Sequence, residues 1–345
     1  MATAPSPADL PGTAREVRLT ALPAGLPARE HFAVVETPLP APAPDQVVVR
    51  NRHFLVFAAL CSLIGGAEGL PLPALKAGDT LFGPAIGEVV AAPDGSALRP
   101  GDLVQHWLGW RDYAVVPAAG CTPLDGTLPD PVAHLAPGSA AYGALTRYAN
   151  IRAGDTVLVT GAAGAVGSLA GQIARLLGAG RVIGSTGSPA KAERLVSELG
   201  YDAVVLRGAD RPFAEQLAEA APDGIDVVLD NVAGEQLVAA LGAARQGARF
   251  ALVGTLSGQL SQTRGGGAPV EIDAFQLILR GISLRGYTGA DHPEVDGEWT
   301  ARLGEWLRSG AIRLPYTAVA GLDNAPQAFE DLLGGKHFGT VVVEP

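Results

Sequence analysis

The chain has 345 residues, 48% of them hydrophobic and 17% charged, and a formal net charge of −10. Its length predicts two domains of about 150 residues each. The acidic balance argues against nucleic acid and gives no reason for an anionic membrane partner. Only two cysteines, Cys61 and Cys121, are present, so a disulfide framework is excluded and a reducing compartment is expected. No apolar run nears the roughly 20 residues of a membrane span, and the start MATAPSPADLPGTAREV has no signal-peptide core. We therefore expect a cytoplasmic protein.

The chain up to about residue 125 predicts a β-rich domain. Short apolar runs rich in valine alternate with Pro, Gly and Asp turns, as in all-β domains. Strands are expected at 15–22, 31–39, 46–56, 86–93, 102–107 and 111–117.

After Pro123 a helix is expected over 134–151, and from Thr156 strands alternate with helices. This pattern predicts an α/β Rossmann domain with a doubly wound, six-stranded parallel sheet. The strands are expected at 156–160, 181–186, 202–207, 225–232, 248–254 and 283–289, and crossover helices at 189–199, 212–221, 234–244 and 269–281. Trp299, Leu303, Trp306 and Leu307 share one face of a further helix. A helix at 325–333 and a strand at 340–345 form a tail that is expected to return to the first domain.

The stretch Thr156–Gly178, TVLVTGAAGAVGSLAGQIARLLG, organises this domain. A strand is followed by Gly161, Gly164 and Gly167 and then by a helix. The first glycine would allow a tight turn, the second close approach of backbone to a pyrophosphate, and the third close helix packing. The turn and the helix N-terminus, including Ala165, Val166 and Ser168, would bind the phosphates. The spacing is GxxGxxG rather than GxGxxG, so a plain turn before a packed helix is the alternative.

Four motifs together resemble the zinc-independent branch of the medium-chain dehydrogenase/reductase superfamily, which contains prostaglandin reductases and alkenal double-bond reductases. They are AAGAVGS (162–168), DNVAGE (230–235), GWRDYAVVP (109–117) and GLDNAPQAFEDLLGGKHFG (321–339). The resemblance implies a GroES-like substrate domain, residues 1–125 and 312–345, and an NADP-binding domain, residues 126–311. It also implies NADPH-dependent reduction of a conjugated double bond without a metal.

The residues at the positions of the zinc ligands of zinc-dependent relatives also indicate that no catalytic metal is bound. Cys61 lies near the position of the catalytic-zinc cysteine of zinc-dependent relatives. Gly83-Pro84-Ala85 stands where those relatives carry Gly-His-Glu, and two cysteines cannot build a four-cysteine lobe. We interpret Cys61 as a small buried apolar residue.

The second strand of the Rossmann domain predicts NADP(H) rather than NAD(H). It ends in Gly184, Ser185 and Thr186, without the acid that binds a ribose diol. A 2′-phosphate would instead meet Ser188, Lys191 and Arg194, and Arg207 where the family carries a tyrosine. The alternative is that Lys191 and Arg194 form a solvated helix face.

Further cofactor contacts are implied by family positions at Asn231 and Val253-Gly254-Thr255. Tyr287 and His337, which stands in GKHFG where the family has Asn, are candidates for contact with the nicotinamide and for catalysis. Tyr142 is a third catalytic candidate. Core packing for the tyrosines and an unremarkable loop position for His337 are the alternatives.

One segment departs from the family pattern. Relatives carry Ser-Val-Asp-Pro-Tyr-Met where this chain has Leu55-Val56-Phe57-Ala58-Ala59-Leu60, so the tyrosine hydroxyl is missing at Ala59. Either the substrate is larger and more hydrophobic, or the segment is core. The main hypothesis is an NADPH-dependent reductase of conjugated carbonyl compounds. A reductive cyclase of bacterial polyketide or tetramate macrolactam biosynthesis and a non-catalytic NADPH-binding protein are the alternatives. The strand at 283–289 is expected to pair with its symmetry mate in a homodimer.

Overall fold

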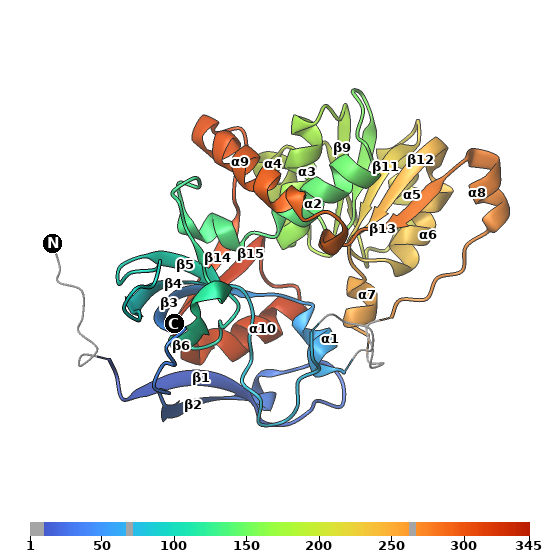
Figure 1. Cartoon of the computed structure of the whole chain (residues 1–345). Helices are drawn as coiled ribbons and strands as arrows, with labels where there is room; N and C mark the ends of the chain where they lie inside the picture. Colours follow the sequence, from blue (N-terminus) through green and yellow to red (C-terminus); the bar gives the residue numbers. More distant parts are fainter. Residues whose placement is uncertain (1–9, 67–71, 262–266) are drawn as a thin grey trace. The chain divides into compact units, whose positions relative to one another are not determined.

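A computed structural model describes residues 10–66, 72–261 and 267–345, and in it the chain divides into two compact units (Figure 1). Unit 1 comprises the described residues of Met1–Leu135 together with Thr317–Lys336 and Val341–Pro345. Unit 2 comprises the described residues of Ala136–Tyr316 together with His337–Thr340.

Unit 1 is built mainly of antiparallel strands. Its centre is β3 (Gln46–Val56), which pairs with β4, β6 and β15 and whose Val47, Val48 and Val49 are fully buried. The main sheet has the order β14-β15-β3-β4-β5-β7, with β6 also on β3, and β1 pairs with β2 separately. The elements are β1 (Thr13–Leu19), β2 (Phe32–Pro38), α1 (Leu60–Ile64), β4 (Ala85–Ala91), β5 (Leu103–His106), β6 (Tyr113–Pro117), β7 (Thr122–Pro123), β14 (Tyr316–Ala320), α10 (Ala325–Leu333) and β15 (Thr340–Glu344). The six expected strands are confirmed, whereas β7 and β14 were not expected.

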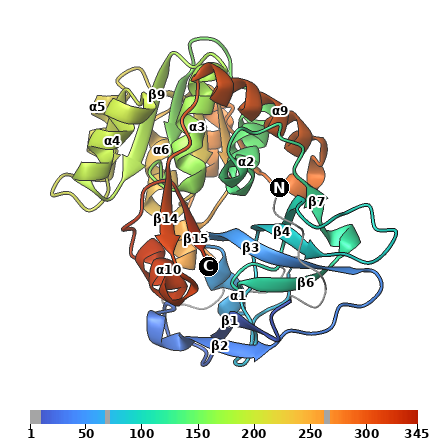
Figure 2. The same cartoon turned by 90° about the vertical axis from the view of Figure 1, so that its left-hand side faces the viewer.

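Most of the C-terminal tail, Thr317–Lys336 and Val341–Pro345, belongs to unit 1, whereas His337–Thr340 belongs to unit 2. In β15, Val341 and Val343 pair antiparallel with Val56 and Phe54 of β3. The predicted helix is α10, which lies beside β15 in Figure 2 and packs on β3. Its Phe329 is fully buried and makes edge contacts with the rings of Phe32 and Trp110.

Unit 2 has the predicted doubly wound parallel sheet, with strand order β10-β9-β8-β11-β12-β13. The chain leaves β8 in one direction and returns to β11 to continue in the other. With right-handed crossovers, this places the helices of the two halves on opposite faces of the sheet, and neighbouring helices within a half pack on each other. The elements are α2 (Gly138–Gly143), β8 (Thr156–Val159), α3 (Ala165–Leu176), β9 (Arg181–Thr186), α4 (Pro189–Leu199), β10 (Ala203–Leu206), α5 (Phe213–Ala220), β11 (Ile225–Asp230), α6 (Gly234–Gly242), β12 (Ala244–Leu252), α7 (Leu256–Gln259), α8 (Ala274–Arg280), β13 (Ser283–Gly286) and α9 (Glu294–Ser309).

The core of unit 2 lies between the sheet and its helices. Neighbouring strands contribute Leu158, Ile183, Val228 and Phe250, each at most 2% exposed, and α5 and α6 pack on this layer. Strands made mostly of apolar residues are expected in a parallel sheet that is covered on both faces.

Three helices differ in detail from expectation. The helix expected at 134–151 is α2 followed by one π-helical turn, Ala144–Tyr148. The helix expected at 269–281 begins only at Ala274, because the Asp273 side chain accepts the Phe275 N–H and caps it. In α9, Trp299 and Leu303 are buried as expected, while Trp306 is only partly buried. Every helix within the described residues falls short of what crossing a membrane requires.

Candidate cofactor site

The glycine turn between β8 and α3 has the predicted geometry. Gly161 has a φ of +61°, which glycine adopts without strain. A Cβ on Gly167 would lie 2.4 Å from the Gly161 carbonyl oxygen, so only glycine lets the first turn of α3 lie this close to the strand end. Gly164 is exposed at the N-cap of α3, and a Cβ there would meet nothing closer than 3.4 Å. The exposed backbone at Gly164 and the first N–H groups of the helix form a ready anion site.

Three buried side chains support the turn from within, and one of them, Ser168, was predicted to bind phosphate. Ser168 is fully buried, and its hydroxyl donates to the Ala165 carbonyl at 3.2 Å. Ser185, at the end of β9, accepts the Gly161 N–H at 3.0 Å and donates to Gln236. Tyr201, which the sequence analysis did not single out, donates its buried hydroxyl to the Gly167 carbonyl at 2.6 Å. Gly171 and Gly184 leave room for the Tyr201 ring, but the positions of these glycines in the sequence do not reveal that contact.

The loops after β11 and β12 meet at the same edge of the sheet. The Asn231 amide donates to the Thr160 carbonyl at 2.8 Å, and the buried Asp230 carboxylate accepts the Thr160 hydroxyl. The Val253 and Gly254 N–H groups donate to the Asp230 carbonyl at 2.8 and 3.1 Å. Thr255 begins α7. The predicted contacts at Asn231 and Val253–Thr255 therefore share one edge with the glycine turn, where such folds bind ligands.

Backbone strain is stored in this loop at Ala233, which has φ +62° and ψ −153°. A residue with a side chain in this region costs about 1–3 kcal/mol. The Ala233 N–H donates to both Asp230 carboxylate oxygens, at 3.1 and 3.0 Å, which holds the conformation.

We expect Ala233→Gly to raise the free energy of unfolding by about 1 kcal/mol, because the relieved strain exceeds the added chain entropy of glycine. Urea denaturation measures the change. Ala239→Gly, within helix α6, is the matched control and should destabilise by about 0.5–1 kcal/mol. Destabilisation of similar size by both variants would contradict the assignment of strain.

Basic side chains gather at the end of β9. The guanidinium of Arg207 lies over Gly187, where a Cβ would come within 3.1 Å of it. Ser188 caps α4 and accepts the Lys191 N–H at 3.4 Å. Lys191 is half-buried, and its ammonium donates to the His337 carbonyl. Burial, with the charge of Arg194 beside it, lowers the pKa of Lys191. Of the two helix residues, only Arg194 fits a solvated face, since it is exposed and paired with Glu198.

The segment His337–Thr340 lies along the glycine turn. Gly339 bridges to Gly164, and its N–H donates to the Ala163 carbonyl at 2.9 Å. His337 was predicted to lie near the cofactor, whereas Gly339, whose φ is +79°, was not predicted to take part.

The three catalytic candidates do not form one cluster. Tyr287 follows β13, and its hydroxyl lies against Gly143, with its ring near those of Tyr148 and His292. Burial raises the pKa of Tyr287. Tyr142 packs against Trp299 and Trp306 at ring distances of 6.1 and 6.4 Å and is 8% exposed, which are the surroundings of a core residue. His337 stands beside Lys191.

In unit 1, the segment Leu55–Leu60, which departs from the family pattern and is called the departing segment below, divides into two parts. Leu55, Val56 and Leu60 are buried and therefore belong to the core, whereas Phe57, Ala58 and Ala59 are partly or fully exposed. Cys61 is buried in α1, and burial raises its pKa to about 12, so it is a protonated thiol. Within the described residues no three His, Cys, Asp or Glu side chains come together as a metal site.

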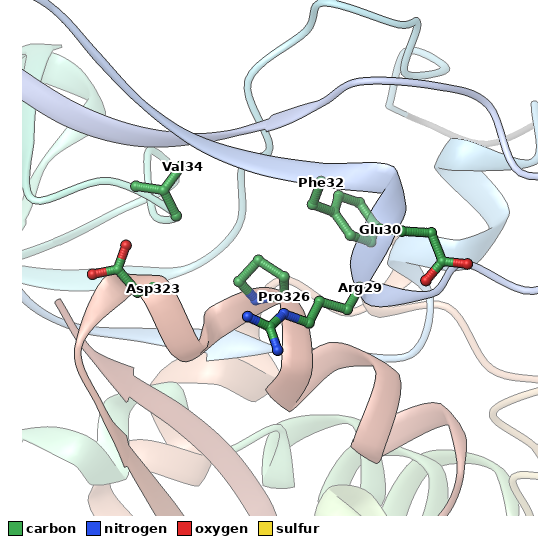
Figure 3. Close-up of a pocket in the computed structure, with 6 residues that line it drawn as sticks. All are labelled: Arg29, Glu30, Phe32, Val34, Asp323 and Pro326. Atoms are coloured by element: carbon green, nitrogen blue, oxygen red, sulfur yellow. The ribbon is translucent and has the colours of Figure 1, made fainter.

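A pocket of about 450 Å³ opens on unit 1 between β2 and α10 (Figure 3). It is lined by Arg29, Glu30, Phe32, Val34, Asp323 and Pro326. Figure 3 shows Arg29 beside Pro326, while Glu30 points away from the other side chains. Asp323 is exposed and accepts a hydrogen bond from Arg15 at 2.5 Å. The lining contains no nucleophile and no buried polar side chain, so no chemistry is assigned to it.

A doubly wound sheet with a glycine turn at its switch point defines a dinucleotide-dependent protein. Comparison with known proteins identifies it further. Residues 165–306 match the family model described as zinc-binding dehydrogenase, and residues 15–124 match the N-terminal domain of oxidoreductase.

Relatives match over nearly the whole chain. The chain is 31% identical to the NADPH-dependent curcumin reductase of Escherichia coli, over 94% of this chain and 95% of that protein. It is 30% identical to prostaglandin reductase 1 of Mus musculus, over 93% and 95%. The NADPH complex of CurA from Vibrio vulnificus has a TM-score of 0.87 and 31% identity, over 96% and 98%. The chain belongs to the zinc-independent branch of the medium-chain dehydrogenase/reductase superfamily.

Proposed function

We propose that this NADP-dependent oxidoreductase reduces a carbon–carbon double bond conjugated to a carbonyl, in a hydrophobic small-molecule substrate. The observation that carries the proposal is the placement of the glycine turn and of Lys191 and Arg207 at one edge of the unit 2 sheet. NADPH-dependent reduction of conjugated double bonds is the chemistry of its family. The non-catalytic alternative is not retained, because the relatives that match most of the chain are named as oxidoreductases and reductases.

The residues present fit NADPH. The exposed Gly164 backbone and the N-terminus of α3 would hold the pyrophosphate. Lys191 and Arg207, with the Ser188 hydroxyl, would hold the 2′-phosphate at a strand end without a competing acid. Asn231 and Val253–Thr255 would line the nicotinamide half, since they follow β11 and β12 on the other side of the switch point.

When bound, NADPH supplies the hydride. Negative charge then develops on the carbonyl oxygen of the substrate, so the protein needs a hydrogen-bond donor there rather than a metal. Tyr287 and His337 are the proposed donors or nicotinamide contacts. The raised pKa of Tyr287 keeps its phenol protonated, which a donor requires. The α carbon of the product takes its proton from solvent or a side chain.

The exposed part of the departing segment, Phe57–Ala59, offers apolar surface without a hydroxyl. That supports a hydrophobic substrate and keeps the reductive cyclase as the second candidate. In that reaction the carbanion formed by hydride addition would close the ring by Michael addition, and the enolate left by that step would take its proton from solvent, without a dedicated donor. Burial of Leu55, Val56 and Leu60 accounts for the rest of the segment by packing.

A substrate panel tests the proposal. We expect NADPH, and much less NADH, to be consumed with a short enal or a diaryl enone, and the product mass to increase by two hydrogens. Turnover restricted to a conjugated polyene macrocycle, with a new ring in the product, would assign the cyclase. Tight NADPH binding without turnover of any of these compounds would reject both.

We also propose a homodimer formed through β13. This strand is at the sheet edge, and the adjoining α8 exposes Phe275, Ile278 and Leu279 by 61%, 75% and 54%. Large exposed apolar side chains next to an unpaired edge are typical of an interface.

We expect the wild-type protein to sediment as a dimer at micromolar concentration and Ile278→Asp to shift it toward monomer. Val196→Asp is the matched control, since Val196 is an exposed apolar residue of α4 in the same unit. A monomeric wild type, or equal dissociation by both variants, would remove the proposal.

A further inference from the structure

Four residues of the C-terminal tail, His337–Thr340, belong to unit 2, although Lys336 before them and Val341 after them belong to unit 1. Backbone bonds hold the second half of this segment. The Gly339 N–H donates to the Ala163 carbonyl at 2.9 Å, and the Thr340 N–H donates to the Pro315 carbonyl at 3.0 Å. A Cβ on Gly339 would lie 2.1 Å from the Pro315 oxygen, so the backbone is clamped between that residue and the glycine turn.

Two side chains of α4 hold the first half. The Lys191 ammonium donates to the His337 carbonyl, and the Arg194 guanidinium lies 4.0 Å from the ring centroid of Phe338. Phe338 is 5% exposed, so this cation–π contact is shielded from water on the ring side. The segment is therefore fixed by the same two elements that carry the proposed pyrophosphate and 2′-phosphate sites.

Lysine is suited to join two acceptors. An ammonium has three N–H donors, so one lysine can hold a main-chain carbonyl and a phosphate oxygen together. The pKa of Lys191 is lowered by burial and by Arg194, so an anion placed beside it would favour its charged form.

We propose that Lys191 is a positioning residue that couples the 2′-phosphate of NADPH to the segment His337–Thr340. The phosphate that distinguishes NADPH from NADH then also orders the segment and sets the position of His337. This inference rests on the proposed NADPH site. It predicts that NADH at saturation supports a lower kcat than NADPH, and not only a higher KM.

Hydrogen exchange tests the coupling without a turnover assay. Exchange of the peptide containing Gly339 and Thr340 is measured with saturating 2′,5′-ADP or 5′-ADP. In the wild type, we expect 2′,5′-ADP to slow exchange about tenfold more than 5′-ADP, the effect of one charge-assisted hydrogen bond. In Lys191→Gln the two nucleotides should give equal exchange, and Lys191→Arg should restore part of the difference. Lys76→Gln, at an exposed lysine of unit 1, should behave as wild type.

A second variant separates binding from coupling. Phe338→Leu removes the cation–π contact, so we expect faster exchange of the segment with unchanged preference for 2′,5′-ADP. Equal protection by both nucleotides in the wild type, or a difference that survives in Lys191→Gln, would overturn the coupling. If neither nucleotide binds, the proposed NADPH site fails and the coupling with it. Failure to reduce any enone leaves the exchange result unaffected.

Discussion

Replacing Gly167 by alanine is expected to lower the free energy of unfolding by about 2 kcal/mol and to abolish NADPH binding. The new Cβ would lie 2.4 Å from the Gly161 oxygen and 2.6 Å from the Ala162 Cα, both backbone atoms that no rotamer can move. Overpacking typically costs about 1–3 kcal/mol, and we expect about 3 kcal/mol here because both clashing atoms belong to the backbone, whereas alanine in a helix gains only about 1 kcal/mol over glycine. The clash therefore exceeds the gain. Chemical denaturation and titration of NADPH measure the two effects.

Gly164→Ala is the matched control in the same turn. Its Cβ would be 3.4 Å from the nearest atom and its φ is −84°, so we expect stability to change by no more than about 1 kcal/mol. Because the added methyl group would stand where backbone must approach the pyrophosphate, NADPH affinity should still fall about tenfold or more. A stable Gly167→Ala protein, or a Gly164→Ala protein with wild-type affinity, would contradict the assignment of these two glycines.

The second prediction with a large effect is a pH dependence of the free energy of unfolding, which arises from His106 in unit 1. His106 is 1% exposed, and burial, with a smaller effect of the Arg111 charge, lowers its pKa from 6.5 to about 4. The folded state therefore favours the neutral ring, while the unfolded chain takes up a proton near pH 6.5. We expect the free energy of unfolding to fall by on the order of 3 kcal/mol as pH decreases from 6.5 to about 4.

The neutral ring is used in the structure. His106 accepts the Leu108 N–H at 3.1 Å through Nδ1, so Nε2 carries the proton that is donated to Asn51 at 2.9 Å. The Asn51 amide in turn donates to the Leu108 and Arg111 carbonyls. This chain of bonds holds the loop of Trp110, whose φ of +62° is unusual for a residue with a side chain.

His106→Gln provides the comparison, measured by denaturation across the same pH range. The variant should lose the His106 part of the pH dependence, while His134, whose pKa burial also lowers, contributes equally to both proteins. A constant difference between the two stability curves at every pH would show that His106 does not titrate differently on folding.

Local sequence patterns predicted the features that depend on residues close together in the sequence. The spacing of Gly161, Gly164 and Gly167 predicted the turn, because a tight turn and a close helix each exclude a Cβ. Six apolar strands alternating with helices predicted the doubly wound parallel sheet, because right-handed crossovers leave few topologies. The strand β14 was missed, since its burial alternates with exposure over only five residues and resembles a loop.

Contacts between residues far apart in the sequence could not be predicted from such local patterns. Tyr201 supports Gly167 and Lys191 meets His337 across 34 and 146 positions of sequence, and no periodicity relates those pairs. The apolar segment at 55–60 could not be divided into core and surface, because that division depends on which neighbours cover each side chain. The catalytic candidates illustrate the same limit: Tyr142 and Tyr287 are chemically alike, yet one packs among tryptophans and the other lies against Gly143.

Because His337–Thr340 belong to unit 2 while the residues on either side belong to unit 1, unit 2 is not formed by one continuous stretch of the chain. A fragment that spans Ala136–Tyr316 keeps every strand of the parallel sheet but leaves Ala163 without the Gly339 N–H and Lys191 without the His337 carbonyl. The dinucleotide domain is therefore not a contiguous cassette. A chimera that exchanges this unit between relatives has to include the four residues His337–Thr340, because a chimera joined only at Ala136 and Tyr316 would lack the hydrogen bonds of Gly339 to Ala163 and of Lys191 to His337.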